Sequence, residues 1–110
     1  MELSVPERVA LLELLADVEG NFLTLKILRK LREELSFSEE EIKAFGLVES
    51  GGKITWERGG GKDVTMGNKA RQIAVETLKQ RDIAGTLRDR HYSLFEKLVE
   101  PMEVETASGA

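Results

Sequence analysis

The sequence contains no cysteine, and this absence excludes several kinds of site. Without thiols the chain has no disulfide, no thiolate nucleophile and no zinc site built on sulfur. One histidine, His91, cannot supply a standard zinc site by itself, and no Gly-x-Ser-x-Gly sequence marks a serine nucleophile. We therefore expect a protein that uses no metal or other cofactor and that is not an enzyme.

Aromatic residues and long apolar runs are also scarce. Four Phe, one Tyr and one Trp predict a core made mainly of aliphatic side chains. No segment approaches the roughly 18 consecutive apolar residues that a membrane span requires. The first residues carry Glu2 and Glu7 where a secretory signal would carry positive charge. These features, together with the missing cysteines, lead us to expect a cytoplasmic protein that does not bind membranes.

The composition is that of an ordinary globular chain, with 41% hydrophobic and 33% charged residues among 110. We expect one domain over residues 1–101 and a flexible acidic tail over residues 102–110. Residues 1–50 hold 11 acidic and 6 basic side chains, a net charge of −5, whereas residues 51–100 hold 7 and 10, a net charge of +3. The two halves are therefore expected to attract each other, within one molecule or between copies.

Helix-start and helix-stop signals divide the chain into five helices. Ser4 with Glu7, and Ser38 with Glu41, have the spacing of capping boxes. Glycine at 46 is placed to end the short helix that Ser38 starts. Asn68 is expected to cap the fourth helix, and Thr86 with Asp89 has the spacing of a capping box for the fifth. These signals and the apolar periodicity predict helices over residues 4–19, 22–35, 39–45, 68–84 and 86–100.

Between the third and fourth helices the pattern changes to that of strands. Residues 47–50 and 53–56 flank Gly51-Gly52, which predicts a β-hairpin. Alternating apolar and polar residues predict a third strand at 62–66, after a flexible glycine-rich loop at 57–61. Three helices, a small antiparallel sheet and two further helices define an α+β fold.

Three apolar residues are candidates for contact with a protein partner. Leu12 and Leu15 belong to an apolar face of the first helix that is too wide for a single stripe. Such a face is usually buried on two sides, and one side is available for sharing between subunits. Trp56 shares a strand face with Ile54 and has two interpretations, closing the core or anchoring a partner.

A nucleic-acid interface is the alternative. Three helices followed by a hairpin is the element order of a winged helix. The basic residues that would serve it are on and after the hairpin: Lys53, Arg58, Lys62 and Arg71. Against it, the helix that would enter the major groove starts with three glutamates, at positions 39–41, and these would repel phosphates.

Four short stretches carry a resemblance that spans residues 4–100. They are EGNF at 19–22, LSFSEEE at 35–41, ITW at 54–56 and HYSLFEK at 91–97. Together they resemble a group of small uncharacterised proteins encoded in microbial and phage or prophage genomes. No activity or binding residue is established for that group, so the resemblance implies none for this chain. The sequence predicts a non-enzymatic protein-interaction or assembly module whose partner is a protein, including a second copy of itself.

Overall fold

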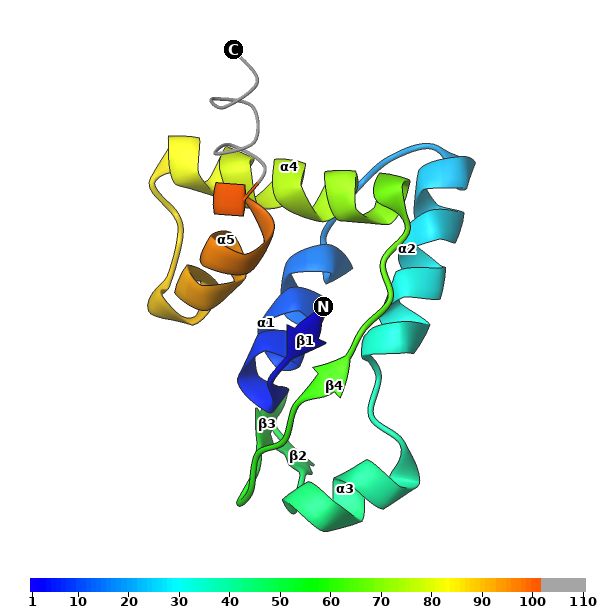
Figure 1. Ribbon diagram of the computed structural model, residues 1–110, viewed down its shortest axis with the longest axis vertical. Coiled ribbons are helices and arrows are strands. Elements are labelled where there is room, and N and C mark those ends of the chain that lie inside the picture. The colour runs from blue at the N-terminus through cyan, green and yellow to red at the C-terminus, as the bar shows by residue number, and fades with distance from the viewer. Residues whose placement is uncertain (102–110) are drawn as a thin grey trace.

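The computed structural model describes residues 1–101, in which helices predominate and strands are short (Figure 1). In chain order the elements are β1 (Glu2–Leu3), α1 (Val5–Ala16), α2 (Phe22–Leu35), α3 (Glu39–Phe45), β2 (Val48–Ser50), β3 (Lys53–Thr55), β4 (Lys62–Asp63), α4 (Asn68–Ala84), a 3-10 helix η1 (Asp89–His91) and α5 (Tyr92–Leu98). Helices and antiparallel strand pairs do not alternate, so the predicted α+β class is confirmed. The predicted acidic tail, 102–110, lies outside the described residues.

Helix α1 lies at the centre of the fold, where α2, α4, η1 and α5 all contact it (Figure 1). Its buried apolar side chains point in several directions around the helix: Val5, Val9, Ala10, Leu11, Leu14 and Leu15. The prediction that this wide apolar face is buried on more than one side is confirmed. Helices of the same chain cover most of this face, and Leu12 on it is only partly buried.

The strongest local signals in the sequence formed as expected. Both capping boxes are present, with the Ser4 and Ser38 hydroxyls accepting from the N–H of Glu7 and Glu41 and the two carboxylates accepting in return. Gly46 ends α3 in the left-handed conformation, with φ of 63°. Each of these signals involves residues at most a few positions apart, so the rest of the fold has little influence on them.

Two predicted caps were wrong. Helix α4 begins at Asn68 itself, after Gly67, and no side chain caps it. Thr86 and Asp89 form no capping box, because the Thr86 hydroxyl instead donates to the Arg81 carbonyl at the end of α4. The helical residues that follow therefore begin with η1, and α5 is shorter than expected.

The strands form two separate pairs. The hairpin β2–β3 has the predicted turn, with Gly51 and Gly52 at φ of 58° and 80°. The predicted third strand does not extend this hairpin. It is reduced to β4, which pairs antiparallel with β1 near the start of the chain. A strand of two residues, such as β1, has no alternating pattern by which the sequence could reveal it.

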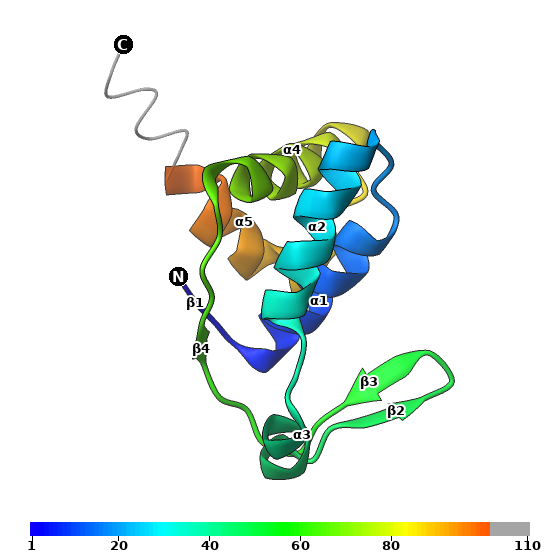
Figure 2. The same ribbon diagram turned by 90° about the vertical axis from the view of Figure 1, so that its right-hand side faces the viewer.

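The elements are distributed along a molecule whose longest dimension is 47 Å. Helix α4 crosses one end, α3 and the hairpin occupy the other, and α1 and α2 run between them (Figures 1 and 2). The hairpin extends away from the helices as an arm (Figure 2). Within residues 1–101 no helix has the length and apolar character needed to cross a bilayer.

Candidate protein-interaction surface

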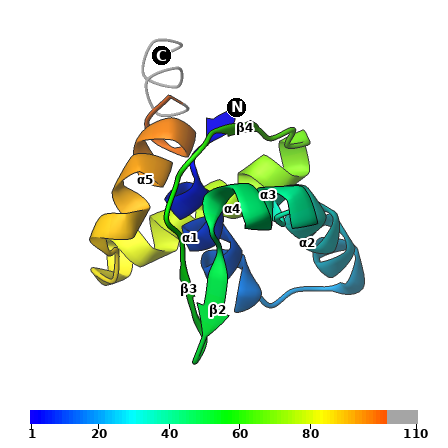
Figure 3. The ribbon, with the colours of Figure 1, turned by 90° about the horizontal axis from the view of Figure 1, so that it is seen from below.

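An apolar groove lies at the foot of the hairpin, where α1, α3 and the two hairpin strands meet. We call it the hairpin groove, and its volume is about 400 Å³. The residues that line it come from four parts of the chain: Leu12, Ser36, Phe37, Ile42, Leu47, Val48, Glu49 and Ile54. Figure 3 views the molecule from this end, with α3 and the hairpin in front of the helices. Six of the eight lining side chains are apolar.

Solvent reaches large apolar side chains in this groove. Val48 is 58% exposed and Ile42 is 42% exposed. Three other hollows, of 520 to 750 Å³, are larger, but none of them is lined by an exposed large apolar residue. Larger volume alone does not make a binding surface. The hairpin groove is where burying side chains against a partner would gain free energy.

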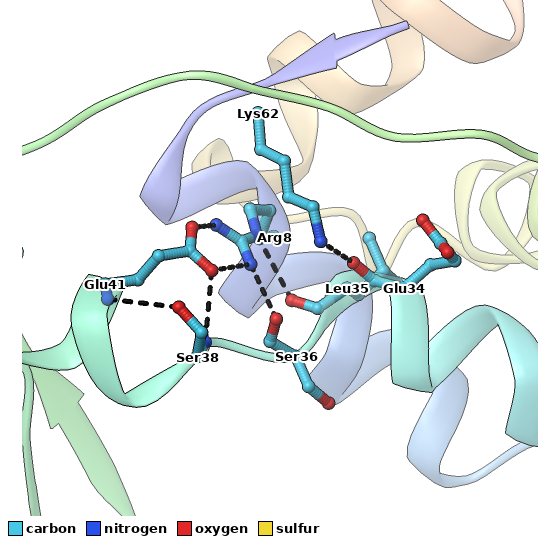
Figure 4. A network of polar contacts seen from close by, with 7 residues as sticks. All are labelled: Arg8, Glu34, Leu35, Ser36, Ser38, Glu41 and Lys62. Carbon is cyan, nitrogen blue, oxygen red and sulfur yellow. Dashed lines mark hydrogen bonds and ion pairs between the residues drawn. The ribbon is translucent and has the colours of Figure 1, made fainter.

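A buried arginine packs against Phe37, one of the residues that line the groove. Its polar contacts are shown in Figure 4. Arg8 of α1 is 0% exposed. Its Nη1 donates to Glu41 Oε2 at 2.6 Å, its Nε to the Leu35 carbonyl at 3.1 Å and its Nη2 to the Ser36 carbonyl at 2.7 Å. The ring of Phe37, which lines the groove, lies 3.9 Å from the guanidinium carbon. One side chain of α1 thus holds the end of α2, the loop that follows and α3.

This network determines where α3 sits. No residue of α3 is buried, so apolar packing alone does not fix the helix. The hydrogen bond from Arg8 lowers the pKa of Glu41 to about 2, against the opposing effect of partial burial, and the capping hydrogen bond from Ser38 adds to the lowering. Glu41 is therefore ionised at neutral pH, and its attraction to Arg8 persists.

Both ends of the hairpin are tied to α3. The Leu47 N–H donates to the Ile42 carbonyl at 3.0 Å before β2. After β3 the N–H groups of Glu57 and Arg58 both donate to the Phe45 carbonyl, at 2.8 and 3.0 Å. The arm and α3 consequently form one unit, and the groove between them has a defined shape.

The structure places the predicted interaction residues in three different settings. Leu12 lines the hairpin groove. Leu15 is only 2% exposed and belongs to the core, so it offers no contact to a partner. Trp56 is 37% exposed and follows β3, but it does not line the groove. Its role as a partner anchor stays a prediction.

The predicted nucleic-acid residues are on separate elements. Lys53 lies in β3 and Arg58 follows it, and both are exposed. Lys62 lies in β4, and its ammonium group donates to the Glu34 carbonyl at 2.7 Å, within the network of Figure 4. Arg71 lies in α4. Lys62 thus has a structural contact, and only Lys53 and Arg58 belong to the hairpin and its exit.

His91 has a structural contact as well. It is buried, and its Nδ1 accepts from the Arg88 N–H at 3.0 Å, which closes η1. Burial lowers the pKa of His91, and the charges of nearby arginines lower it further. At neutral pH the ring is therefore neutral. Among residues 1–101 no three His, Asp or Glu side chains gather closely enough to hold a metal ion.

Arg8 is not among the site residues predicted from the sequence, although the sequence contains a signal for it. Arg8 precedes Leu11, Leu12 and Leu15 by three, four and seven positions, so it shares their face of the helix. A cation on an apolar face predicts a buried partner, since an unpaired buried charge costs several kcal/mol. Helical periodicity does not indicate which carboxylate in the chain pairs with Arg8.

Comparisons with known proteins give no information about this surface. No protein-family model matches the chain, and no curated protein or solved structure matches it either. The resemblance to small phage and prophage proteins therefore stays a prediction.

Proposed function

We propose that this chain is a non-enzymatic protein-interaction module that associates with copies of itself through the hairpin groove. The observation that carries the proposal is the groove itself, which is mainly apolar, open to solvent and held in shape by the Arg8 network. Protein interfaces commonly have an apolar centre surrounded by polar groups. Here Glu49 and Ser36 provide the polar part of the lining.

The hairpin beside the groove supports the same proposal. Among the described residues β2 pairs only with β3, so each strand has one edge whose backbone groups meet no other strand. Such edges bind extended segments of other chains by adding a strand. A partner that filled the groove and met this edge would gain both apolar burial and backbone hydrogen bonds.

The test is the molar mass measured by light scattering during size exclusion, at low and high salt. We expect the wild-type chain to exceed its monomer mass of 12.3 kDa and to do so at both salt concentrations. Val48→Asp and Ile42→Asp place a charge in the groove and should each give monomers, because a buried charge without a partner opposes association. Circular dichroism spectra of both variants serve to check that they remain folded.

Ile83→Asp is the matched control. Ile83 is also an exposed apolar residue, but it lies near the end of α4 and does not line the groove. The Ile83→Asp variant should have the same molar mass as the wild type. A wild-type chain that stays monomeric at every concentration would overturn the proposal.

The same experiment with mixed oligonucleotides tests the alternative. Lys53→Glu with Arg58→Glu is the informative variant, since changing Lys62 would also break its contact with α2. A complex that forms only at low salt and that this double variant abolishes would favour a nucleic-acid-binding protein instead.

A further inference from the structure

The first turn of α2 exposes apolar side chains at the end of the molecule opposite the groove. Phe22 is 81% exposed, and Leu23 and Leu25 in the same turn are about half exposed. A single exposed apolar residue is ordinary, but several that adjoin one another are typical of a contact surface. Asn21 caps the helix here through its side chain, which accepts from the Thr24 N–H, so the exposed turn is well formed.

Basic residues follow on the same side of the helix. Lys26 and Arg29 lie four and seven positions after Phe22, which places all three on one face. Glu33 is four positions after Arg29, the spacing of an ion pair, yet no ion pair between them forms. Neither basic side chain has an ion pair or side-chain hydrogen bond within residues 1–101. We call Phe22, Leu23, Leu25, Lys26 and Arg29 the α2 tip.

Acidic side chains lie at the hairpin groove and on its α3 side, whereas the hairpin itself carries the basic Lys53. Glu49 lines the groove, and Glu39 and Glu40 are exposed in the first turn of α3, the helix that forms one of its walls. Within residues 1–101 none of these three carboxylates has an ion pair or side-chain hydrogen bond to satisfy it. The groove thus offers an apolar centre with unpaired acidic groups beside it, and the α2 tip offers apolar side chains with unpaired basic groups beside them.

The two surfaces cannot meet within one molecule. Helix α2 begins beside α4 and ends beside the loop that leads to the groove (Figures 1 and 2). Its 14 residues hold the tip and the groove apart. A helix of that length extends about 21 Å. Contact between them requires a second copy of the chain.

We propose that the α2 tip of one copy occupies the hairpin groove of the next, with Phe22 as the apolar anchor and Lys26 and Arg29 facing the glutamates of α3. This inference rests on the proposed self-association and specifies its geometry. The contact is head-to-tail, because it joins two different surfaces. Unless the copies close into a ring, the assembly grows with concentration instead of stopping at a dimer.

Mixing two variants tests this geometry. Phe22→Asp destroys the tip and leaves the groove, whereas Val48→Asp destroys the groove and leaves the tip. Each variant alone should have the monomer mass. Their equimolar mixture should have twice that mass and should not grow further, because one intact tip meets one intact groove. Both positions are well exposed, so neither substitution removes a core contact.

The other outcomes separate this inference from the proposed function. If the wild type and Phe22→Asp assemble and Val48→Asp does not, the groove binds a second groove, and only the head-to-tail geometry is overturned. A mixture that remains monomeric overturns it as well. If the wild type is monomeric throughout, both proposals fail. Binding of that monomer to phosphatidylserine vesicles, lost in Phe22→Asp, would then assign the tip to a membrane surface.

Discussion

At the scale of single residues, Arg8 is the side chain on which the candidate surface depends most. A buried guanidinium is costly unless its donors are satisfied, and Arg8 donates to a carboxylate and to two carbonyls. All three acceptors lie in chain segments 27 to 33 residues away. The cost of burial therefore favours the single arrangement of α2 and α3 in which these groups converge, and the groove exists only in that arrangement.

Substituting Glu41 should reveal this coupling through pH. Because the pKa of Glu41 in the folded chain is about 2, below its ordinary value of 4.5, its contribution to stability is fully present above pH 4.5 and is lost as the pH falls towards 2. We expect Glu41→Gln to be less stable than the wild type at pH 7, by about 1–2 kcal/mol for a partly exposed charged hydrogen bond. The difference should shrink below pH 4.5. Urea unfolding followed by circular dichroism at several pH values measures it.

Glu40→Gln is the control for this experiment. Glu40 precedes Glu41 in the same helix turn but contacts no cation among residues 1–101. Its stability should follow that of the wild type at every pH. A constant difference between Glu41→Gln and the wild type from pH 7 to pH 3 would contradict the assigned pKa.

At the scale of elements, the sequence predicted what neighbouring residues determine. Capping boxes, the glycine that ends α3 and the two-residue hairpin turn all formed as predicted, since each is decided within a few positions. The pairing of β4 with β1 was not predictable, because it joins residues about 60 positions apart through two short strands. The Thr86 cap was wrong for a different reason: the spacing of Thr86 and Asp89 was that of a capping box, but the Thr86 hydroxyl has a competing acceptor five positions earlier, the Arg81 carbonyl at the end of α4.

The candidate surface was predictable only in part. Phe37 and Ile42 have the spacing of a hydrophobic staple around Ser38, and both line the groove. Leu12 was predicted as an interaction residue and lines the groove. Helical periodicity predicted the same role for Leu15, whose side chain is instead buried in the core. Which side of a wide apolar face remains open depends on the helices that pack against it, and periodicity contains no information about their positions.

The loop between β3 and β4 gives a prediction at this scale. Glycines in such a loop suggest flexibility, but a Cβ atom on Gly60 would lie 2.9 Å from the ring of Phe45, whereas one on Gly59 would meet nothing within 4 Å. Gly60→Ala must displace that ring and should be less stable than Gly59→Ala by about 1 kcal/mol. Gly59→Ala should equal or slightly exceed the wild type, because alanine restricts the unfolded chain. Urea unfolding of both variants provides the comparison, and equal stabilities would show that the loop does not pack on α3.

At the scale of the whole molecule, Lys97 joins the two ends of the described chain. Its ammonium group donates to the Glu7 carboxylate at 2.6 Å and to the Glu2 carbonyl at 2.9 Å. Glu7 is almost fully buried in α1, so Lys97 secures α5 against both α1 and β1. Burial by itself would raise the pKa of Glu7, but hydrogen bonds from Lys97 and from the Ser4 N–H outweigh it and the pKa is lowered.

Lys97→Met should therefore destabilise the molecule in a pH-dependent way. In the wild type the lowered pKa of Glu7 means that its contribution is present above pH 4.5 and is lost in acid. Without Lys97, burial acts against the ionised carboxylate, and we expect a loss of about 2 kcal/mol at pH 7, reduced from the usual cost of a broken buried pair because Lys97 is 40% exposed. The loss of stability should diminish towards pH 4 as Glu7 is protonated.

The double variant Glu7→Gln with Lys97→Met is the control. It removes both charges and should regain part of the lost stability at pH 7, as measured by urea unfolding. If the double variant is as unstable as Lys97→Met, the apolar stem of Lys97 rather than its charge holds α5 in place.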